Sequence, residues 1–138
     1  MDSKVIEARL KKLDGYYSSL LRFDGLSLAE YSQSDDVQTI VERKLQLCIQ
    51  TCIDIANYLV SRKRLRIPDE EGNIFVVLSE EGIIGKELAE RMKGMVNFRN
   101  ILVHEYLEID NELVHRNLTQ NLNDFNAFAQ NIIQYLEL

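Results

Sequence analysis

The 138-residue chain is long enough for one globular domain and too short for two domains with separate cores. Apolar residues make up 46% of it and charged residues 28%, which is ordinary for a soluble protein. One proline and six glycines are too few for the many turns of an all-β fold. The formal net charge of −6 argues against a broad surface for nucleic acid, so any contact with nucleic acid needs a local basic patch.

The chain shows no membrane segment, because no apolar run approaches the roughly 18 residues of a membrane span. An amphipathic pattern follows the N-terminus in place of an apolar signal core, so we expect a cytoplasmic protein. Cys48 and Cys52 lie four residues apart and therefore on one face of a helix. A metal pair there is conceivable, but no nearby histidine or cysteine completes a tetrahedral site. We interpret both as buried, reduced, structural thiols and predict neither metal nor cofactor.

The first half of the chain predicts two helices. Apolar residues recur at threes and fours over residues 5–21, and Asp24-Gly25 offers a stop signal. Ser34-Asp35-Asp36 is a good N-cap cluster for a second helix. The second helix carries an apolar seam that consists of Val41, Leu45, Cys48, Cys52, Ile55 and Leu59. This seam could pack inside the domain or against a second copy of the chain.

Four basic residues follow the second helix, namely Arg62, Lys63, Arg64 and Arg66. Basic side chains favour helix C-termini for electrostatic reasons alone, so a solvated cap is one interpretation. The other is a patch that contacts a nucleic-acid backbone, which would give an acidic protein local positive charge.

The second half predicts three more helices. Residues 74–81 form a β-branched run with no second strand to pair with, so we expect a short helix capped by Gly82. A fourth helix is expected from near Gly85, with Leu88, Met92 and Met95 on one stripe. A single last helix is expected from Asp110 or Asn111, with an apolar stripe of Leu118, Leu122, Phe125, Ala129, Ile132 and Leu136. The prediction is an all-α, single-domain antiparallel bundle of about five helices over residues 1–138.

The stripe of the fourth helix extends to Arg99, four residues beyond Met95. A charge on an apolar face either pairs with a carboxylate, such as Asp54 or Glu42, or lines a cleft that receives an anion. His104 follows five residues later, which in a straight helix places it roughly 140° away. The two side chains could meet only if the helix ends or bends between them.

The second histidine, His115, lies three residues before Leu118 on the stripe of the last helix. We interpret it as a histidine at the core edge or in a cleft.

The stretch Phe98 to Tyr106, FRNILVHEY, resembles the R-x4-H-x-Y signature of the HepT-like (DUF86) toxins in the HEPN superfamily. The segments 41–49 and 52–56 resemble the second helix of that family. Residues 82–96 also follow the family pattern into the motif, and Ile109-Asp110 continues it. The resemblance covers roughly residues 37–136 and is least telling before residue 35.

The resemblance implies a metal-independent endoribonuclease that works as a homodimer, with the two motifs facing each other across a cleft. The implied reaction is attack by the RNA 2′-OH on the adjacent phosphate, which gives a 2′,3′-cyclic phosphate and a 5′-OH end. His104 would transfer protons near neutral pH, and Arg99 would bind phosphate oxygens. Asn100 would orient the phosphate or His104, the alternative being a hydrogen bond at the helix end.

For Tyr106 the resemblance implies AMPylation by a small (MNT-type) nucleotidyltransferase antitoxin. An added phosphodiester near Arg99 and His104 would compete with substrate phosphate. The expectation is therefore a prokaryotic toxin–antitoxin protein with RNA and the antitoxin as partners, and with no DNA and no membrane among them. The alternatives are a non-catalytic helical module that dimerises and binds nucleotide or substrate beside a nucleotidyltransferase, and a helical protein with a chance motif.

Overall fold

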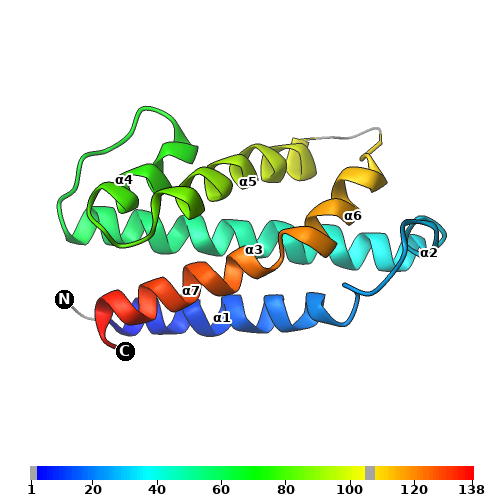
Figure 1. The fold of residues 1–138 in the computed structure, drawn as a ribbon, viewed down its shortest axis with the longest axis horizontal. Coiled ribbons are helices and arrows are strands. Elements are labelled where there is room, and N and C mark those ends of the chain that lie inside the picture. Colours follow the sequence, from blue (N-terminus) through cyan, green and yellow to red (C-terminus); the bar gives the residue numbers. More distant parts are fainter. Residues whose placement is uncertain (1–2, 105–107) are drawn as a thin grey trace.

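The computed structural model describes residues 3–104 and 108–138. Over these residues the chain forms α1 (Lys4–Leu21), α2 (Leu28–Ser32), α3 (Asp35–Arg62), the 3-10 turn η1 (Glu71–Asn73), α4 (Ile74–Glu80), α5 (Lys86–His104), α6 (Asn111–Gln120) and α7 (Asn123–Leu136). The long helices α1, α3, α5 and α7 run in alternating directions (Figure 1). The predicted all-α antiparallel bundle is confirmed. The described residues form seven α-helices, whereas about five were predicted.

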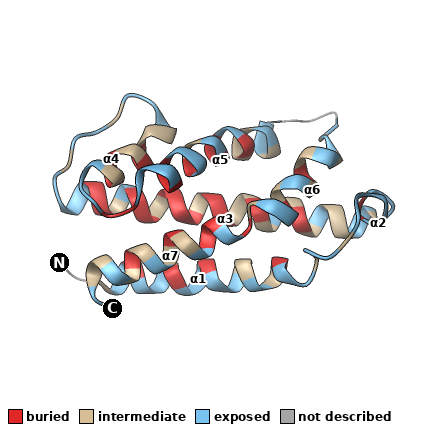
Figure 2. Ribbon diagram, in the orientation of Figure 1, coloured by how far each residue is buried: buried red, intermediate tan, exposed pale blue. Residues whose placement is uncertain are grey.

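Helix α3 forms the centre of the bundle, with α1 and α5 on opposite sides of it (Figure 1). Figure 2 shows the buried residues on the faces that α3, α5 and α7 turn toward one another. All six residues of the apolar seam on α3 are buried within the chain. The seam therefore packs inside the domain, which decides between the two predicted alternatives.

The start of α3 follows from local chemistry. The Ser34 hydroxyl accepts a hydrogen bond from the Val37 amide at 3.2 Å, as predicted for an N-cap. The short helix α2 was not predicted. It begins with a capping box in which Ser27 and Glu30 exchange hydrogen bonds of 3.1 and 3.0 Å.

The ambiguous β-branched run is helical, as predicted. Four of its five apolar side chains, Ile74, Phe75, Val77 and Leu78, are buried, which a helix achieves on one face over seven residues. Gly82 follows with φ of +72°, a backbone conformation that favours glycine and ends the helix.

The prediction of a single last helix is wrong, because the helix is interrupted between α6 and α7. The side-chain amide of Asn121 donates to the Asn117 side-chain oxygen at 3.0 Å, and α7 begins only at Asn123. Leu122, between the two helices, is also buried, so the apolar period of the sequence continues across the interruption. The period therefore gave no sign that the helix ends there. The change of direction allows α7 to pack along α1 (Figure 1).

The two cysteines are buried and unpaired, as predicted. Burial raises the pKa of Cys48 to about 12 and that of Cys52 well above its ordinary value. Both thiols are therefore protonated and unreactive near neutral pH. Among the helices of residues 3–104 and 108–138, none combines the length and apolar character that a membrane span needs.

Candidate active site

Arg99 lies where the buried stripe of α5 ends. Leu88, Met92 and Met95 are buried, and the Arg99 side chain one turn later is only 11% exposed. The helical period of α5 thus places the guanidinium in a polar cluster between α5, α3 and η1. This cluster consists of Asn100, Gln50 and Glu71.

Four acceptor atoms surround this guanidinium. Asn100 Oδ1 accepts from Nε at 3.1 Å and from Nη2 at 2.7 Å, and Gln50 Oε1 accepts from Nη1 at 2.7 Å. The Glu71 carboxylate accepts from Nη1 at 3.3 Å and also from Nη2. Because a guanidinium has five N–H groups, these contacts give each of them a partner.

Glu71 is therefore the carboxylate that pairs with Arg99, and neither predicted candidate is. Asp54 reaches the cluster indirectly, because its Oδ1 accepts from the Gln50 amide at 3.0 Å. Glu42 lies toward Tyr31, and burial raises the pKa of its carboxyl. The prediction failed because the helical period identifies residues that share a face of one helix. It does not predict which residues of a distant turn, here η1, pack against that face.

Gln50 and Glu71 are the members of the cluster that the sequence analysis missed. Glu71 lies 28 residues before Arg99, on a turn that approaches α5 closely. A Cβ at Gly72 would lie 3.2 Å from Lys93 Cγ and 3.4 Å from its carbonyl oxygen, so glycine permits this approach. The acidic run before Gly72 was the available signal.

His104 is the last residue of α5 and is exposed. The helix is continuous from Arg99 to His104, so the bend or end that would be needed for the two side chains to meet does not occur. Residues five apart on one helix point roughly 140° away from each other. Consistent with this, Arg99 and His104 make no contact among the described hydrogen bonds and ion pairs.

Tyr106 lies outside the described residues, so its predicted modification is untested. The side-chain oxygen of Asn100 accepts two hydrogen bonds from the Arg99 guanidinium, and the predicted role of Asn100 toward phosphate or His104 stays a prediction.

His115 lies at the edge of the core, which was one of the two predicted positions. Its Nε2 is 2.6 Å from the Leu26 carbonyl oxygen, and its ring centre is 6.0 Å from that of Tyr31. These contacts tie α6 to the segment before α2, which is a structural role.

The basic residues after α3 are mostly engaged within the chain. Arg66 forms a bidentate ion pair with Glu80, with both distances 2.8 Å. Arg62 and Lys63 lie 5.2 and 4.9 Å from the ring centres of Tyr58 and Tyr135. Arg62 is also about 18 Å along α3 from Gln50, at 1.5 Å per residue. Arg62 is therefore well separated from Arg99.

A second basic surface, between α1 and α3, was not predicted. Lys11, Lys12 and Lys44 line a hollow there together with Tyr16, and its charged lining residues are all cationic. Lys44 Nζ lies 5.4 Å from the centre of the Tyr16 ring. The hollow is therefore a local positive surface on a protein of acidic composition.

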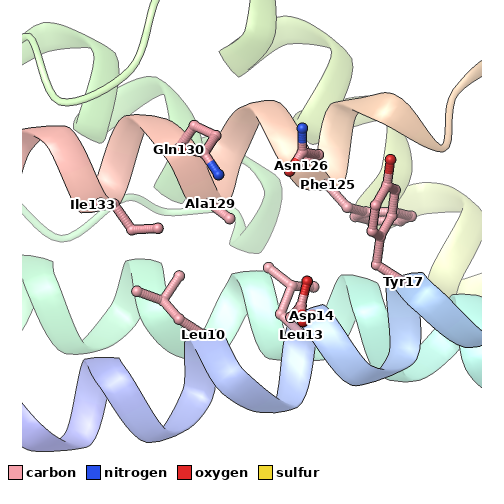
Figure 3. A pocket seen from close by; sticks show the side chains of 9 residues that line it. All are labelled: Leu10, Leu13, Asp14, Tyr17, Phe125, Asn126, Ala129, Gln130 and Ile133. Atoms are coloured by element: carbon pink, nitrogen blue, oxygen red, sulfur yellow. The ribbon is translucent and has the colours of Figure 1, made fainter. Parts of the chain in front are cut away.

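A further pocket, of about 140 Å³, lies between α1 and α7 (Figure 3). Leu10, Leu13, Phe125 and Ile133 give it a mainly apolar lining, and it contains none of the residues around Arg99. Within the part of the chain that the structure describes, no cluster of three or more histidine, cysteine or carboxylate side chains could hold a metal ion.

Comparisons with a family model and with known proteins agree on one family. The family model described as "Ribonuclease HepT-like" matches residues 6–132. The "mRNA nuclease HepT" of Shewanella oneidensis is 34% identical over 100 residues, which cover 72% of this chain and 75% of that protein. The "tRNA nuclease HepT" of Aphanizomenon flos-aquae is 33% identical over 132 residues, which cover 96% and 90%.

Solved structures agree with this. The tri-AMPylated HEPN toxin of Shewanella oneidensis, in complex with MNT antitoxin, aligns with a TM-score of 0.86 at 28% identity and covers 97% of this chain and 99% of that one. YutE from Bacillus subtilis, described as a cytosolic protein of unknown function, aligns with a TM-score of 0.78 over 95% and 90% of the chains. Its 21% identity supports the fold alone. With the family model spanning most of its length, the chain belongs to the ribonuclease HepT-like family.

Proposed function

We propose that the protein is a metal-independent endoribonuclease and the toxin of a toxin–antitoxin pair. The observation that carries the proposal is the Arg99 guanidinium, which is 11% exposed and held in one orientation by Asn100 and Gln50. A preorganised, weakly hydrated cation of this kind suits the charge that develops on a phosphate during cleavage. RNA cleavage is also what the curated relatives are named for.

The proposed reaction uses the RNA itself as nucleophile. The 2′-oxygen attacks the adjacent phosphorus and loses its proton to a base, and the bond from phosphorus to the 5′-oxygen breaks. An acid protonates the departing 5′-oxygen, which leaves a 2′,3′-cyclic phosphate and a 5′-OH end. His104 serves in proton transfer because imidazole titrates near neutral pH, and Arg99 binds the phosphate oxygens.

The proposed active unit is a homodimer. Arg99 and His104 point in different directions from α5, so one chain does not bring them together at a single phosphate. A second copy would contribute a second histidine, which provides both a base and an acid. The exposed apolar side chains Ile101 and Val103, 40% and 38% exposed beside His104, suit a contact between copies.

The proposed control is AMPylation of Tyr106 by a nucleotidyltransferase antitoxin. The Tyr106 hydroxyl would attack the α-phosphorus of ATP, giving an AMP ester and pyrophosphate. The added phosphodiester would place a negative charge two residues from His104 and compete with RNA for cations. The AMPylated state of the similar Shewanella toxin, in complex with MNT antitoxin, supports this step. The proposal places the protein in the cytoplasm, beside the RNA it cleaves.

The test is growth on induction of the chain without an antitoxin, together with cleavage of total RNA in EDTA by purified protein freed of AMP. His104→Gln should be harmless and inactive. His115→Gln is the matched control, because it changes the only other histidine and should leave toxicity and cleavage intact. Tyr106→Phe should stay toxic when the antitoxin is present.

Harmless and inactive wild-type protein, or equal loss in both histidine variants, would contradict the proposal. In that event the acidic composition favours the non-catalytic module that binds nucleotide or substrate beside a nucleotidyltransferase.

A further inference from the structure

We propose that Glu71 is an internal competitor for RNA, which occupies the phosphate-binding edge of Arg99 until a substrate phosphate displaces it. This inference rests on the proposed role of Arg99 in binding RNA phosphate. It assigns a function to an acidic residue that the reaction itself does not use.

The first argument is the count of donors on Arg99. Asn100 takes Nε and one N–H of Nη2, and Gln50 takes one N–H of Nη1. The two remaining N–H groups, one on each terminal nitrogen, point at the Glu71 carboxylate. This terminal edge has the two-pronged geometry with which arginine binds phosphate oxygens. A phosphate can therefore reach the fork only if one of the three partners leaves.

The second argument concerns which partner leaves. Asn100 is the residue next to Arg99 on α5, and Gln50 is fixed in turn by Asp54. The Glu71 side chain is 46% exposed, whereas the Arg99 side chain is 11% exposed. Water can replace the lost contacts of an exposed carboxylate, so the free-energy cost of its release is small. Glu71 is the only one of the three that also carries the charge of a phosphate.

The third argument concerns how the release happens. Gly72 packs its backbone against Lys93, with no room for a Cβ at ordinary contact distance, and this holds η1 on α5. The backbone of the turn therefore stays in place, and rotation of the Glu71 side chain is enough to open the edge. Release also removes a negative charge that would repel the incoming phosphate.

The test compares Glu71→Gln with Glu70→Gln. Glu70 is the adjacent exposed glutamate and makes no described ion pair, so both variants change the net charge equally. Binding of a fluorescent 2′-O-methyl RNA, which cannot be cleaved, is measured by anisotropy. Glu71→Gln should bind about fivefold more tightly than wild type, the effect expected from removing one partly exposed competing charge. Glu70→Gln should bind as wild type does.

A double-mutant cycle makes the test specific to Arg99. The gain from Glu71→Gln should vanish when Arg99 is replaced by glutamine. A gain that persists without Arg99, or one of equal size in Glu70→Gln, would overturn the proposal because it reflects net charge only.

Inorganic phosphate separates this inference from the proposed function. Phosphate should raise the Tm of Glu71→Gln more than that of wild type, and Arg99→Gln should abolish the difference. If this holds while wild type neither binds nor cleaves RNA, the nuclease proposal fails and the competition at Arg99 stands. Equal phosphate effects in Glu71→Gln and wild type would overturn the inference even if the protein cleaves RNA.

Discussion

Two arginines of α5 form ion pairs with carboxylates from other elements, and the two pairs differ in which member is buried. In the pair of Arg99 with Glu71 the arginine is buried and the carboxylate exposed, at 11% and 46%. In the pair of Arg91 with Asp124, joined at 3.1 Å, the arginine is 51% exposed and the carboxylate 12%. The buried member is the one that the fold holds. Only the first pair therefore offers a fixed cation to an external anion, whereas the second neutralises a fixed anion and has a structural role.

The strongest way to break this comparison is to shorten both arginines to lysine. Arg99→Lys loses the planar fork that fills the contacts to Asn100 and Gln50, so RNA cleavage should fall about 100-fold or more. Arg91→Lys keeps a charge on an exposed side chain and should change the rate less than about twofold. Cleavage rates of a defined RNA in EDTA measure both. Similar losses in the two variants would remove the functional distinction between the pairs.

Removal of the carboxylate from each pair should change the free energy of unfolding by different amounts. Asp124→Ala removes a buried carboxylate at the start of α7, where it also faces the helix dipole, and should lower the free energy of unfolding by about 2 kcal/mol. Glu71→Ala removes an exposed carboxylate and should cost less than about 1 kcal/mol. Urea denaturation of both variants checks the order. A larger loss in Glu71→Ala would mean that Glu71 is the structural partner.

The fixation of Arg99 is tested through Gln50. Gln50→Met has similar volume but no acceptor for Nη1, so kcat should fall about tenfold through misplacement of the guanidinium, with little change in Tm. Gln46→Met, one turn earlier on α3, is the control, since Gln46 makes no described contact with Arg99. Equal kcat in the two variants would show that Asn100 alone is sufficient.

The smallest expected effect is a pH-dependent change in stability at Glu42. Burial raises the pKa of this carboxyl above its usual value of 4.5, so the folded state binds its proton more tightly than the unfolded state does. Stability from this group is present below pH 4.5 and is lost as the pH rises through the raised pKa. Glu42→Gln should therefore raise the Tm at pH 7 by about 1–3 °C, and the gain should shrink toward pH 4.5. A gain that does not depend on pH would point to packing instead of ionisation.

The sequence was sufficient where one helix or one cap determined the outcome. The helical period of the seam on α3, the N-cap at Ser34 and the stop at Gly82 each depend on residues that are close in the sequence. The period of α5 also placed Arg99 beside the core. Contacts between distant segments were not predictable in this way: Glu71 reaches Arg99 through a close approach at Gly72, and Gln50 through the packing of α3 on α5. The break between α6 and α7 escaped because Leu122 kept the apolar period across it.

The most direct test of the central claim is the chemistry of the RNA ends made by the purified, AMP-free protein in EDTA. The account predicts a 2′,3′-cyclic phosphate and a 5′-OH at each cut, produced by wild type and His115→Gln, absent with His104→Gln and formed about 100-fold or more slowly with Arg99→Lys. Products with 3′-OH and 5′-phosphate ends, or cleavage that needs a divalent cation, would contradict a reaction carried by Arg99 and His104.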